Sequence, residues 1–548
     1  MKFLKNKTRA FILLLLTITY IGCDNYLKEE LYNSVAIENF IDENNADQLV
    51  VSIYAQLRSV YKNYNYQFLG TDLFTVKSEL FNTNPQNDYF AYTASESDGY
   101  WNANYNVIAK ANTAINRYEN QINWSDGRLN ERAYGIAQAK ALRGLAFFNL
   151  VQQFGGVVLS TEEPLTIRTD YTRSTEQESY EFIIIDLEAA IPNLVDDPQT
   201  GRFSRRAAQH LLAKVYLTRG YKSYAESSDF STAAALAETA IGNYDIRSQS
   251  FEEVFDFDNQ VNPEILFAIQ WGASGVASDK NNTKHSLFMT SVFEYPGVSR
   301  NNQYGGIGSS GMPTPYFYSL FTENDTRENA TIHRTIIADE TSMIGTDNII
   351  PGDTLVYYPK NTLDNEELID RLNRYWVYQP DQYLFGRPDD ISGVNYLYSR
   401  NPLLVNFPYF KKFDDEDINA EGEGSRDTFV FRVAGTHLIA AEAHLGAGNI
   451  AQALFHINRV RERATGVSNE YKTVTIDNIL NERAMELAGE VNRWTTLKRT
   501  GKLLERIEMY NPHYRDHGAF DPNIHYLRPI PINELVISPN TMTQNPGY

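Results

Sequence analysis

The sequence has few of the residues that cross-link secreted domains or bind nucleic acids. Its 548 residues include one cysteine, Cys23, so no disulfide can form within the chain. Lys and Arg number 49 against 69 Asp and Glu, which gives a formal net charge of −20. Nucleic-acid affinity depends on basic side chains that neutralise phosphates, so this balance argues against such a partner. Beyond residue 22, no apolar run is long enough to span a membrane as a helix.

The sequence also lacks the motifs that mark common catalytic and metal sites. It has no His-Glu-x-x-His, no nucleophile elbow and no cysteine pair, and its nine histidines are scattered. The glycine-rich segment 305–311 has no following lysine for a phosphate loop, and the acidic run 414–417 lacks EF-hand spacing. We therefore expect no enzymatic activity, no cofactor and no metal ion.

The N-terminus carries a segment typical of secretion. Four basic residues within the first ten precede an apolar run at 11–21, which is too short to span a bilayer as a helix. The run ends at Gly22-Cys23, and a small residue before the single cysteine is typical of lipoprotein processing. We expect 1–22 to be a signal peptide and Cys23 to carry the lipid. Tyr20 stands where Leu or a small residue is more usual, and the alternative is ordinary cleavage beside an incidental thiol.

Helical periodicity dominates the first half of the chain and returns near the end. Apolar residues repeat at helical spacing over 45–60, 101–118 and 132–154, and again over 180–194 and 204–219. The segment 430–463 predicts two helices joined by a glycine-containing turn, the length of a tetratricopeptide unit. The expected fold is mainly α: a solenoid of tetratricopeptide-like helix pairs.

The segment between these helical blocks has a different amino-acid composition. It is rich in Gly, Ser, Asn and isolated aromatics, with strand candidates at 264–270 and 354–358. We expect one domain over 23–548, with a helical scaffold at about 40–270 and 427–500. A loop-rich variable region with short strands would occupy about 271–426, and an extended tail 501–548.

Short strings in a fixed order run through nearly the whole chain. They include Cys-Asp-Asn-Tyr-Leu at 23–27, Lys-Ala-Leu-Arg-Gly at 140–144, Gly-Arg-Phe-Ser at 201–204, Glu-Ile-Leu-Phe-Ala at 264–268, Asn-Arg-Val-Arg at 458–461, Glu-Arg-Ala-Met-Glu-Leu at 482–487 and Gln-Asn-Pro-Gly-Tyr at 544–548. In this order, behind a lipoprotein signal, the chain resembles the SusD/RagB outer-membrane lipoproteins of Bacteroidota.

The resemblance implies about four tetratricopeptide-like units and a variable, ligand-capturing face. It implies an outer-membrane, cell-surface protein that is anchored by lipid and partners a SusC-like TonB-dependent transporter. Ligands in this family are mostly oligosaccharides, with peptides in some members. The acidic net charge favours a neutral oligosaccharide over an anionic one.

Candidate ligand-binding residues come from three polar-aromatic stretches without helical periodicity, at 72–101, 271–316 and 375–398. Aromatic rings can stack on the C–H faces of sugars while polar side chains bind the hydroxyls. The expected glycan-binding residues are Trp101, Trp271, Trp376, Asp72, Lys77, Asn82, Tyr89, Tyr92, Tyr295, Arg300, Asn302, Tyr304 and Tyr378. The alternative for each ring is that it packs in a local hydrophobic core, which is what we expect for Trp494.

One carboxylate cluster requires a choice between catalysis and structure. Glu482, Glu486 and Glu490 share one face at helical spacing, beside Arg483 and Arg493. A glycosidase places two carboxylates on opposite sides of the sugar bond, and neighbours on one helix point the same way. We therefore expect a structural charge network. The functional alternatives to glycan capture are uptake of peptides, a surface hydrolase and a scaffold that holds other proteins.

Overall fold

The computed structural model describes residues 41–548 except 63–64, 77–83, 167, 199, 273–280, 290–291, 293–294, 300–310, 345–346, 381–406, 420–421, 491–492 and 540. Helices dominate these ranges, as expected, and the strands are short. None of the helices so described combines the length and apolar character of a membrane span.

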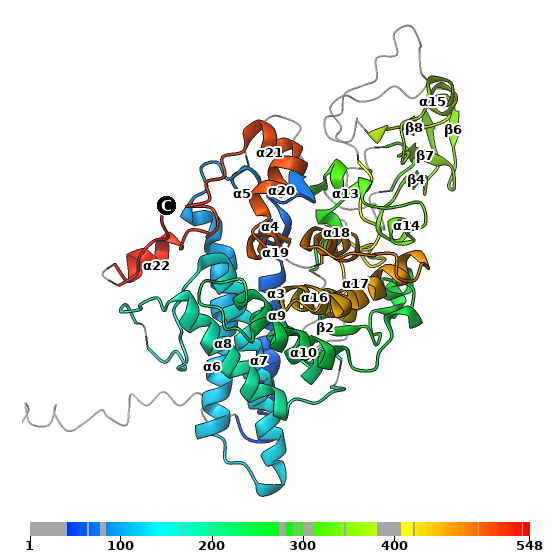
Figure 1. The fold of residues 1–548 in the computed structure, drawn as a ribbon. Helices are drawn as coiled ribbons and strands as arrows, with labels where there is room; N and C mark the ends of the chain where they lie inside the picture. The colour runs from blue at the N-terminus through cyan, green and yellow to red at the C-terminus, as the bar shows by residue number, and fades with distance from the viewer. Residues whose placement is uncertain are drawn as a thin grey trace, which may run out of the picture.

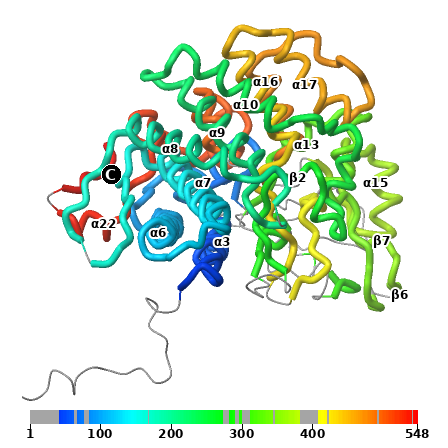
Figure 2. The backbone as a smooth tube through the Cα atoms, turned by 90° about the horizontal axis from the view of Figure 1, so that it is seen from below, coloured from blue at the N-terminus to red at the C-terminus, as the bar shows by residue number. Residues whose placement is uncertain are grey.

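Two blocks of helices, distant in sequence, build one stack. The first block packs in chain order as α3 (Asp47–Tyr61), α6 (Asp98–Asn120), α7 (Leu129–Phe154), α8 (Glu176–Ala190), α9 (Arg205–Arg219) and α10 (Asp229–Ile241). The second block is the pair α16 (Val433–Gly446) and α17 (Ile450–Thr465), followed by α18 (Ile476–Leu487). Because α16 packs directly on α10, the two blocks form a continuous series of helix pairs, and Figure 2 shows α10 next to α16 and α17. The predicted tetratricopeptide-like solenoid is confirmed.

Local sequence explains where these helices begin and end. Thr175 caps α8 in a reciprocal capping box with Glu178, and Thr475 caps α18 in the same way with Asn478. At the other end, Gly466 closes α17 in the left-handed conformation, with φ +72°.

The loop-rich insertion leaves and re-enters the scaffold at one place. Strand β2 (Ile265–Ile269) pairs antiparallel with β9 (Thr428–Arg432), and a second bridge joins Asn282 to Gly424. The chain segments before and after the insertion are therefore hydrogen-bonded to each other. Some 150 residues separate the two strands in the sequence. Because the strands pair, this long insertion interrupts the helical stack without separating its halves.

The insertion contains short strands, one of them at the predicted 354–358, together with small helices, and one of its strands pairs with a strand from the first half of the chain. Strand β1 (Phe74–Val76) pairs with β3 (Gly311–Pro313), and α13 (Pro315–Ser319) and α14 (Arg327–Thr331) follow. A further sheet of β4 (Thr335–Ile337), β7 (Thr354–Tyr357) and β8 (Trp376–Val377) lies beside α15 (Asn365–Leu372), and β5 (Ser342–Ile344) pairs with β6 (Asp347–Ile349). Figure 1 shows this sheet at the upper right, far from the lower ends of α6 and α7.

The C-terminal segment differs from the expected extended tail. It contains three short helices, α20 (Leu503–Tyr510), α21 (Pro512–His517) and α22 (Ile532–Ile537). Asn511 accepts a hydrogen bond from the backbone N–H of Tyr514, and Pro512 occupies the first turn of α21. These capping features, rather than a long apolar periodicity, define α21. A search for helical periodicity therefore missed this helix.

Candidate ligand-binding surface

The β1–β3 pair brings two of the three polar-aromatic stretches together. In its register Val76 faces Gly311. Residue 77 follows Val76, and residue 310 precedes Gly311, so the segments 77–83 and 300–310 are attached to neighbouring backbone positions. Lys77, Asn82, Arg300, Asn302 and Tyr304 belong to these segments and lie outside the described residues, so their binding roles stay predictions.

The third stretch is attached beside the second. The ring of Tyr295 lies 4.8 Å, centroid to centroid, from that of Trp376, and its hydroxyl is hydrogen-bonded to that of Tyr378. Tyr295, Trp376, Tyr378, Phe74 and Met312 all belong to one hydrophobic cluster. The insertion core therefore brings together the bases of all three stretches that the sequence singles out.

The three candidate tryptophans lie inside the protein, which corrects their expected position on loop surfaces. Trp101, Trp271 and Trp376 expose 1%, 0% and 8% of their surface. The indole of Trp101 meets Phe154 edge-on at 5.0 Å, and Trp271 donates a hydrogen bond of 3.0 Å to the Thr428 hydroxyl. Rings packed against protein groups on their faces and edges leave no platform for a sugar in this conformation.

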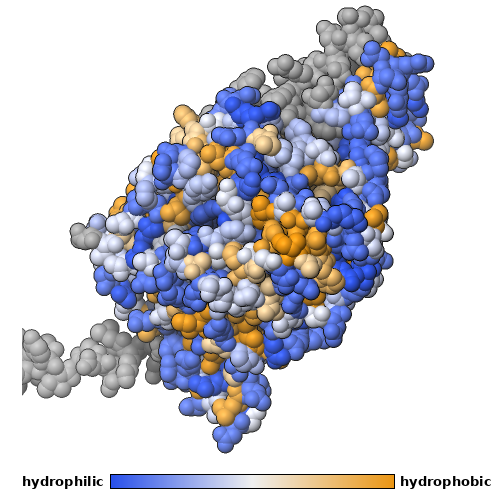
Figure 3. Space-filling model, viewed as in Figure 1, coloured by the Kyte–Doolittle hydropathy of each residue, from blue (hydrophilic) through white to orange (hydrophobic). Residues whose placement is uncertain are grey.

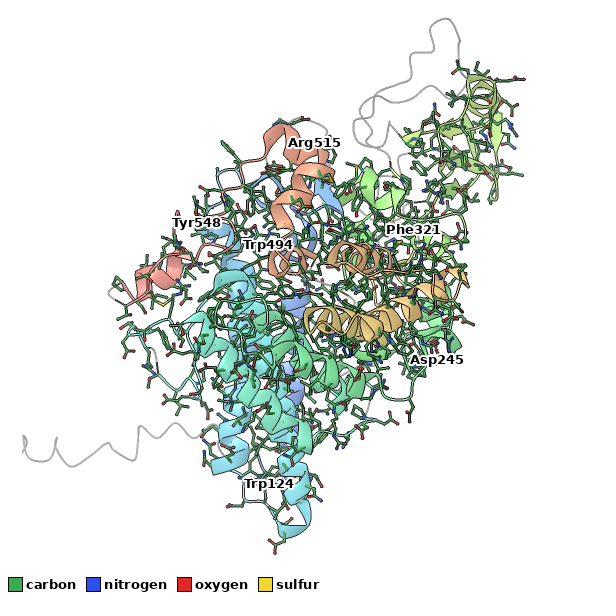
Figure 4. The ribbon with its side chains drawn as sticks, in the orientation of Figure 1. Trp124, Asp245, Phe321, Trp494, Arg515 and Tyr548 are labelled. Carbon is green, nitrogen blue, oxygen red and sulfur yellow. The ribbon has the colours of Figure 1, made fainter. Side chains whose placement is uncertain are left out.

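The remaining described candidates are also buried: Asp72, Tyr89, Tyr92, Tyr295 and Tyr378. The Tyr89 hydroxyl donates to the carbonyl of Gly70 and accepts from the indole N–H of Trp494 at 3.0 Å. Trp494, labelled in Figure 4, is fully buried, as expected from its helix. Their buried positions fit support of the loop bases better than contact with a ligand.

Asp72 anchors the start of β1 to the C-terminal helices. Its carboxylate accepts two hydrogen bonds from Arg493, at 2.9 and 2.6 Å, and one from Arg506 at 3.0 Å. Burial alone would raise the pKa of Asp72, but the charges of Arg493 and Arg506 outweigh it and lower that pKa below its usual value. The ion pairs thus fix β1 relative to α19 (Arg493–Arg499) and α20.

At this end of β1 two partly exposed aromatic rings stack. The centroids of Tyr316 and Tyr510 are 3.6 Å apart, with 15° between the ring planes. Arg506 donates to the Tyr316 hydroxyl at 3.0 Å, and that hydroxyl donates to Asn481 at 2.6 Å. Tyr316 follows Pro313 by three residues, so the stack adjoins the Phe74–Pro313 end of the pair, opposite the Val76–Gly311 end. We call these two ends of the β1–β3 pair, with the Tyr316–Tyr510 stack, the loop rim.

Phe90 adds an exposed ring next to the buried Tyr89. Its side chain is 51% exposed, and the residues on both sides, Tyr89 and Ala91, have positive φ angles of 60° and 52°. Such angles are uncommon outside glycine and turn the chain so that Tyr89 points inward while Phe90 points outward. Sequence reasoning missed Phe90 because its exposure depends on these backbone angles, and it missed Tyr510 because its ring partner, Tyr316, lies far away in the sequence.

Glu482 and Glu486 of α18, together with Glu490 just beyond the end of that helix, form the predicted structural network. All three carboxylates are buried and ion-paired with residues of other elements: Glu482 with Arg327 at 2.7 Å, Glu486 with Arg432 at 2.6 Å, and Glu490 with Lys412 at 2.7 Å. Burial opposes the charge of Glu486, but Arg463, Arg432 and Arg327 outweigh it and hold its pKa well below the usual range. This cluster joins the scaffold to the insertion, and Glu490 also lines two small hollows of about 40 and 10 Å³.

Two hollows in the described part of the chain are lined by residues outside the loop rim. Two clefts of about 500 and 550 Å³ share Phe257 of η5 (Phe257–Asn259). The larger is lined by aromatic, amide and charged side chains, among them Tyr54, Arg58, Gln270 and Asp427. These residue types are suited to a polar ligand as well, so the clefts are the structural rival to the loop rim.

Known proteins identify the group to which this architecture belongs. Residues 263–548 match the model of the SusD family, and residues 25–217 match a model described as starch-binding associating with outer membrane. The chain belongs to the SusD family.

Its SusD-family relatives share most of its length. SusD-like protein P2 of Formosa agariphila is 27% identical, over 98% of this chain and 99% of the relative. A SusD-like protein of Bacteroides ovatus is 27% identical, over 75% of this chain and 67% of its own. Among solved structures, a laminarin binding SusD-like protein aligns with a TM-score of 0.65 at 23% identity, covering 93% of this chain and all of its own. Surface glycan-binding protein A from Bacteroides uniformis has a TM-score of 0.67 at 19% identity, covering 92% and 99%.

Proposed function

We propose that this SusD-family protein captures oligosaccharides at the cell surface and delivers them to a SusC-like TonB-dependent transporter. The observation that carries the proposal is the loop rim, where the β1–β3 pair and the insertion core bring together the bases of three polar-aromatic stretches. Partly exposed aromatic rings stand beside amide, carboxylate and guanidinium groups there, the combination that binds sugars.

The named ligands of similar structures support a glycan. One structural neighbour is described as laminarin binding, and another was solved with a xylogluco-oligosaccharide. The family model that matches residues 25–217 is described as starch-binding. The mechanism is binding and release: rings stack on C–H faces, polar groups bind hydroxyls, and no bond is broken. The carboxylates of Glu482, Glu486 and Glu490 are unsuited to glycoside hydrolysis, because each is already paired with a buried cation.

Anchoring and delivery form the finer part of the proposal. We place a lipid on Cys23 and the protein at the outer membrane, in line with the family description. The scaffold presents exposed apolar side chains that a protein partner would cover, including Ile185, Phe455 and Val536. Figure 3 shows apolar groups of this kind among mainly hydrophilic ones on one face.

Calorimetric titration of neutral and anionic oligosaccharides tests the site. Tyr510→Ala and Phe90→Ala are expected to weaken binding by about 30-fold or more if each ring contributes as a buried anchor, about 2 kcal/mol. The matched control is Phe455→Ala, an exposed ring of similar size on α17. A neutral ligand should bind with little dependence on salt, because screening acts on charges.

Other outcomes would point to the rivals. Unchanged binding in Tyr510→Ala and Phe90→Ala, with loss in Arg58→Ala, would move the site to the larger cleft at Phe257. Binding of peptides but not of glycans would keep the uptake role and change the ligand. Release of new reducing ends from a polysaccharide would contradict a pure binding function.

A further inference from the structure

Three metal-ligating side chains meet where the two helical blocks touch. Glu238 lies in the last turn of α10, His444 on α16 and His456 on α17, and one ligand atom of each lies within 4.8 Å of the others. Oε1 of Glu238 is 2.9 Å from Nε2 of His444 and 3.4 Å from Nε2 of His456. The two imidazole rings are nearly parallel, at 10°, with centroids 5.5 Å apart.

We propose that these residues form a site for a divalent transition-metal ion of the Zn²⁺ type. Imidazole nitrogens with one carboxylate oxygen are a donor set that zinc binds, in a tetrahedron completed by water. Ligand atoms about 2.05 Å from a tetrahedral ion are about 3.4 Å from each other. The two nitrogen–oxygen distances are close to that spacing, so an ion would need only small side-chain movements. The Glu238 side chain is 45% exposed, which gives ion and water access.

A fourth residue orients one of the ligands. Nδ1 of His437 lies 3.0 Å from Nδ1 of His456. When Nε2 of His456 binds an ion, its Nδ1 carries the proton and donates it to His437, the usual outer-shell support of a metal-bound histidine.

The position of the cluster gives the ion a structural role. Glu238 belongs to the helical block before the insertion, whereas His444 and His456 belong to the block after it. Figures 1 and 2 both show α10 beside the α16–α17 pair. An ion bound here would therefore cross-link the two blocks independently of the β2–β9 pairing. Because the unfolded chain does not hold these residues together, binding would stabilise the native state.

The test uses the purified protein without an affinity tag, freed of metal by chelation. Zn²⁺ is titrated by calorimetry, and the melting temperature is measured with and without Zn²⁺, with Mg²⁺ as the hard-cation comparison. We expect one zinc per chain, a higher melting temperature with zinc and no effect of Mg²⁺. His444→Gln and Glu238→Gln should each weaken zinc binding by about 100-fold or more, since outer-shell changes alone cost 10- to 100-fold.

The control is His333→Gln, which removes the imidazole of another histidine–carboxylate pair, 2.6 Å from Asp414. It should leave zinc binding unchanged. Glu238→Gln alters an exposed side chain and so tests the site even if a histidine variant misfolds. The proposal fails if stoichiometric zinc binding is absent, if it survives in both cluster variants, or if bound zinc leaves the melting temperature unchanged.

Discussion

The helical scaffold and the loop-rich insertion fill their cores with different residues. The scaffold core is rich in alanine, with fully buried residues such as Ala111, Ala139, Ala141, Ala207 and Ala213 between helices. The insertion core is built around aromatic rings, among them Phe74, Phe288, Phe317, Phe410 and Phe413. Phe288 stacks on Phe410 with 5.0 Å between centroids and meets Phe74 at the same distance.

The two cores differ in composition because the packing is regular in the scaffold and irregular in the insertion. Helices in pairs repeat the same contact along their length, and small side chains let their backbones approach closely. The insertion has short elements without a repeat, so large rings fill the irregular spaces between them. Aromatic residues in a segment without periodicity are therefore poor evidence of an exposed binding face, as Trp271 and Trp376 illustrate.

The largest effect is expected where the two cores are joined. Glu486 of α18 contacts Arg327 of the insertion at 3.1 Å and Arg432 of β9 at 2.6 Å, and it also pairs with Arg463. Glu486→Ala leaves three buried guanidinium groups without this partner and should lower the free energy of unfolding by about 5 kcal/mol. Urea unfolding measures this loss. Glu508→Ala, an exposed carboxylate of α20, is the control and should change it by less than about 0.5 kcal/mol.

Phe288→Ala tests the aromatic core itself. The ring of Phe288 is in direct contact with those of Phe68, Phe74, Phe410 and Phe413. Removing it therefore opens a cavity among these four rings. We expect a loss of about 4 kcal/mol in the free energy of unfolding, against little change for the exposed Phe455→Ala. Equal small losses in both variants would show that the insertion tolerates voids and that its rings are not tightly packed.

Sequence reasoning succeeded where contacts are local. The periodicity over 132–154 located α7 (Leu129–Phe154), and the apolar run at 264–270 located β2. It failed where position depends on distant partners. The indole of Trp271 is buried against Thr428, 157 positions away, and Tyr510 is paired with Tyr316 from another element. The histidines of the proposed metal site looked scattered for the same reason, since folding alone unites α10 with α16 and α17.

The scaffold should be sensitive to added volume rather than to lost volume. Gly135 and Gly144 both lie inside α7, so replacement by Ala gives each the same gain in helix propensity, about 1 kcal/mol. A Cβ on Gly135 would lie 2.0 Å from Cε1 of the buried Tyr118, whereas one on Gly144 would lie 3.3 Å from Leu187. We expect Gly135→Ala to destabilise by about 2 kcal/mol and Gly144→Ala to be neutral or slightly stabilising in thermal unfolding. Similar melting temperatures for the two variants would contradict tight packing between α6 and α7.

An effect of pH is expected at the boundary between the two regions, at the residue before β9. Burial raises the pKa of Asp427 to about 6, although the backbone N–H of Trp271 and the charges of Arg426 and Arg58 act in the opposite direction. The unfolded chain has a pKa near 3.9, so the folded state binds more protons between these values. Its contribution to stability is therefore full below about pH 4 and is lost as pH rises through about 6.

Asp427→Asn removes this penalty and keeps an oxygen that can accept the 3.0 Å hydrogen bond from Trp271. We expect the variant to gain about 2 kcal/mol in the free energy of unfolding at pH 8 and almost nothing at pH 4. Urea unfolding at the two pH values measures the difference. A loss of stability at pH 8 would mean that Arg58 and Arg426 depend on the carboxylate charge, and that ion pairing, more than burial, sets the energetics at this boundary.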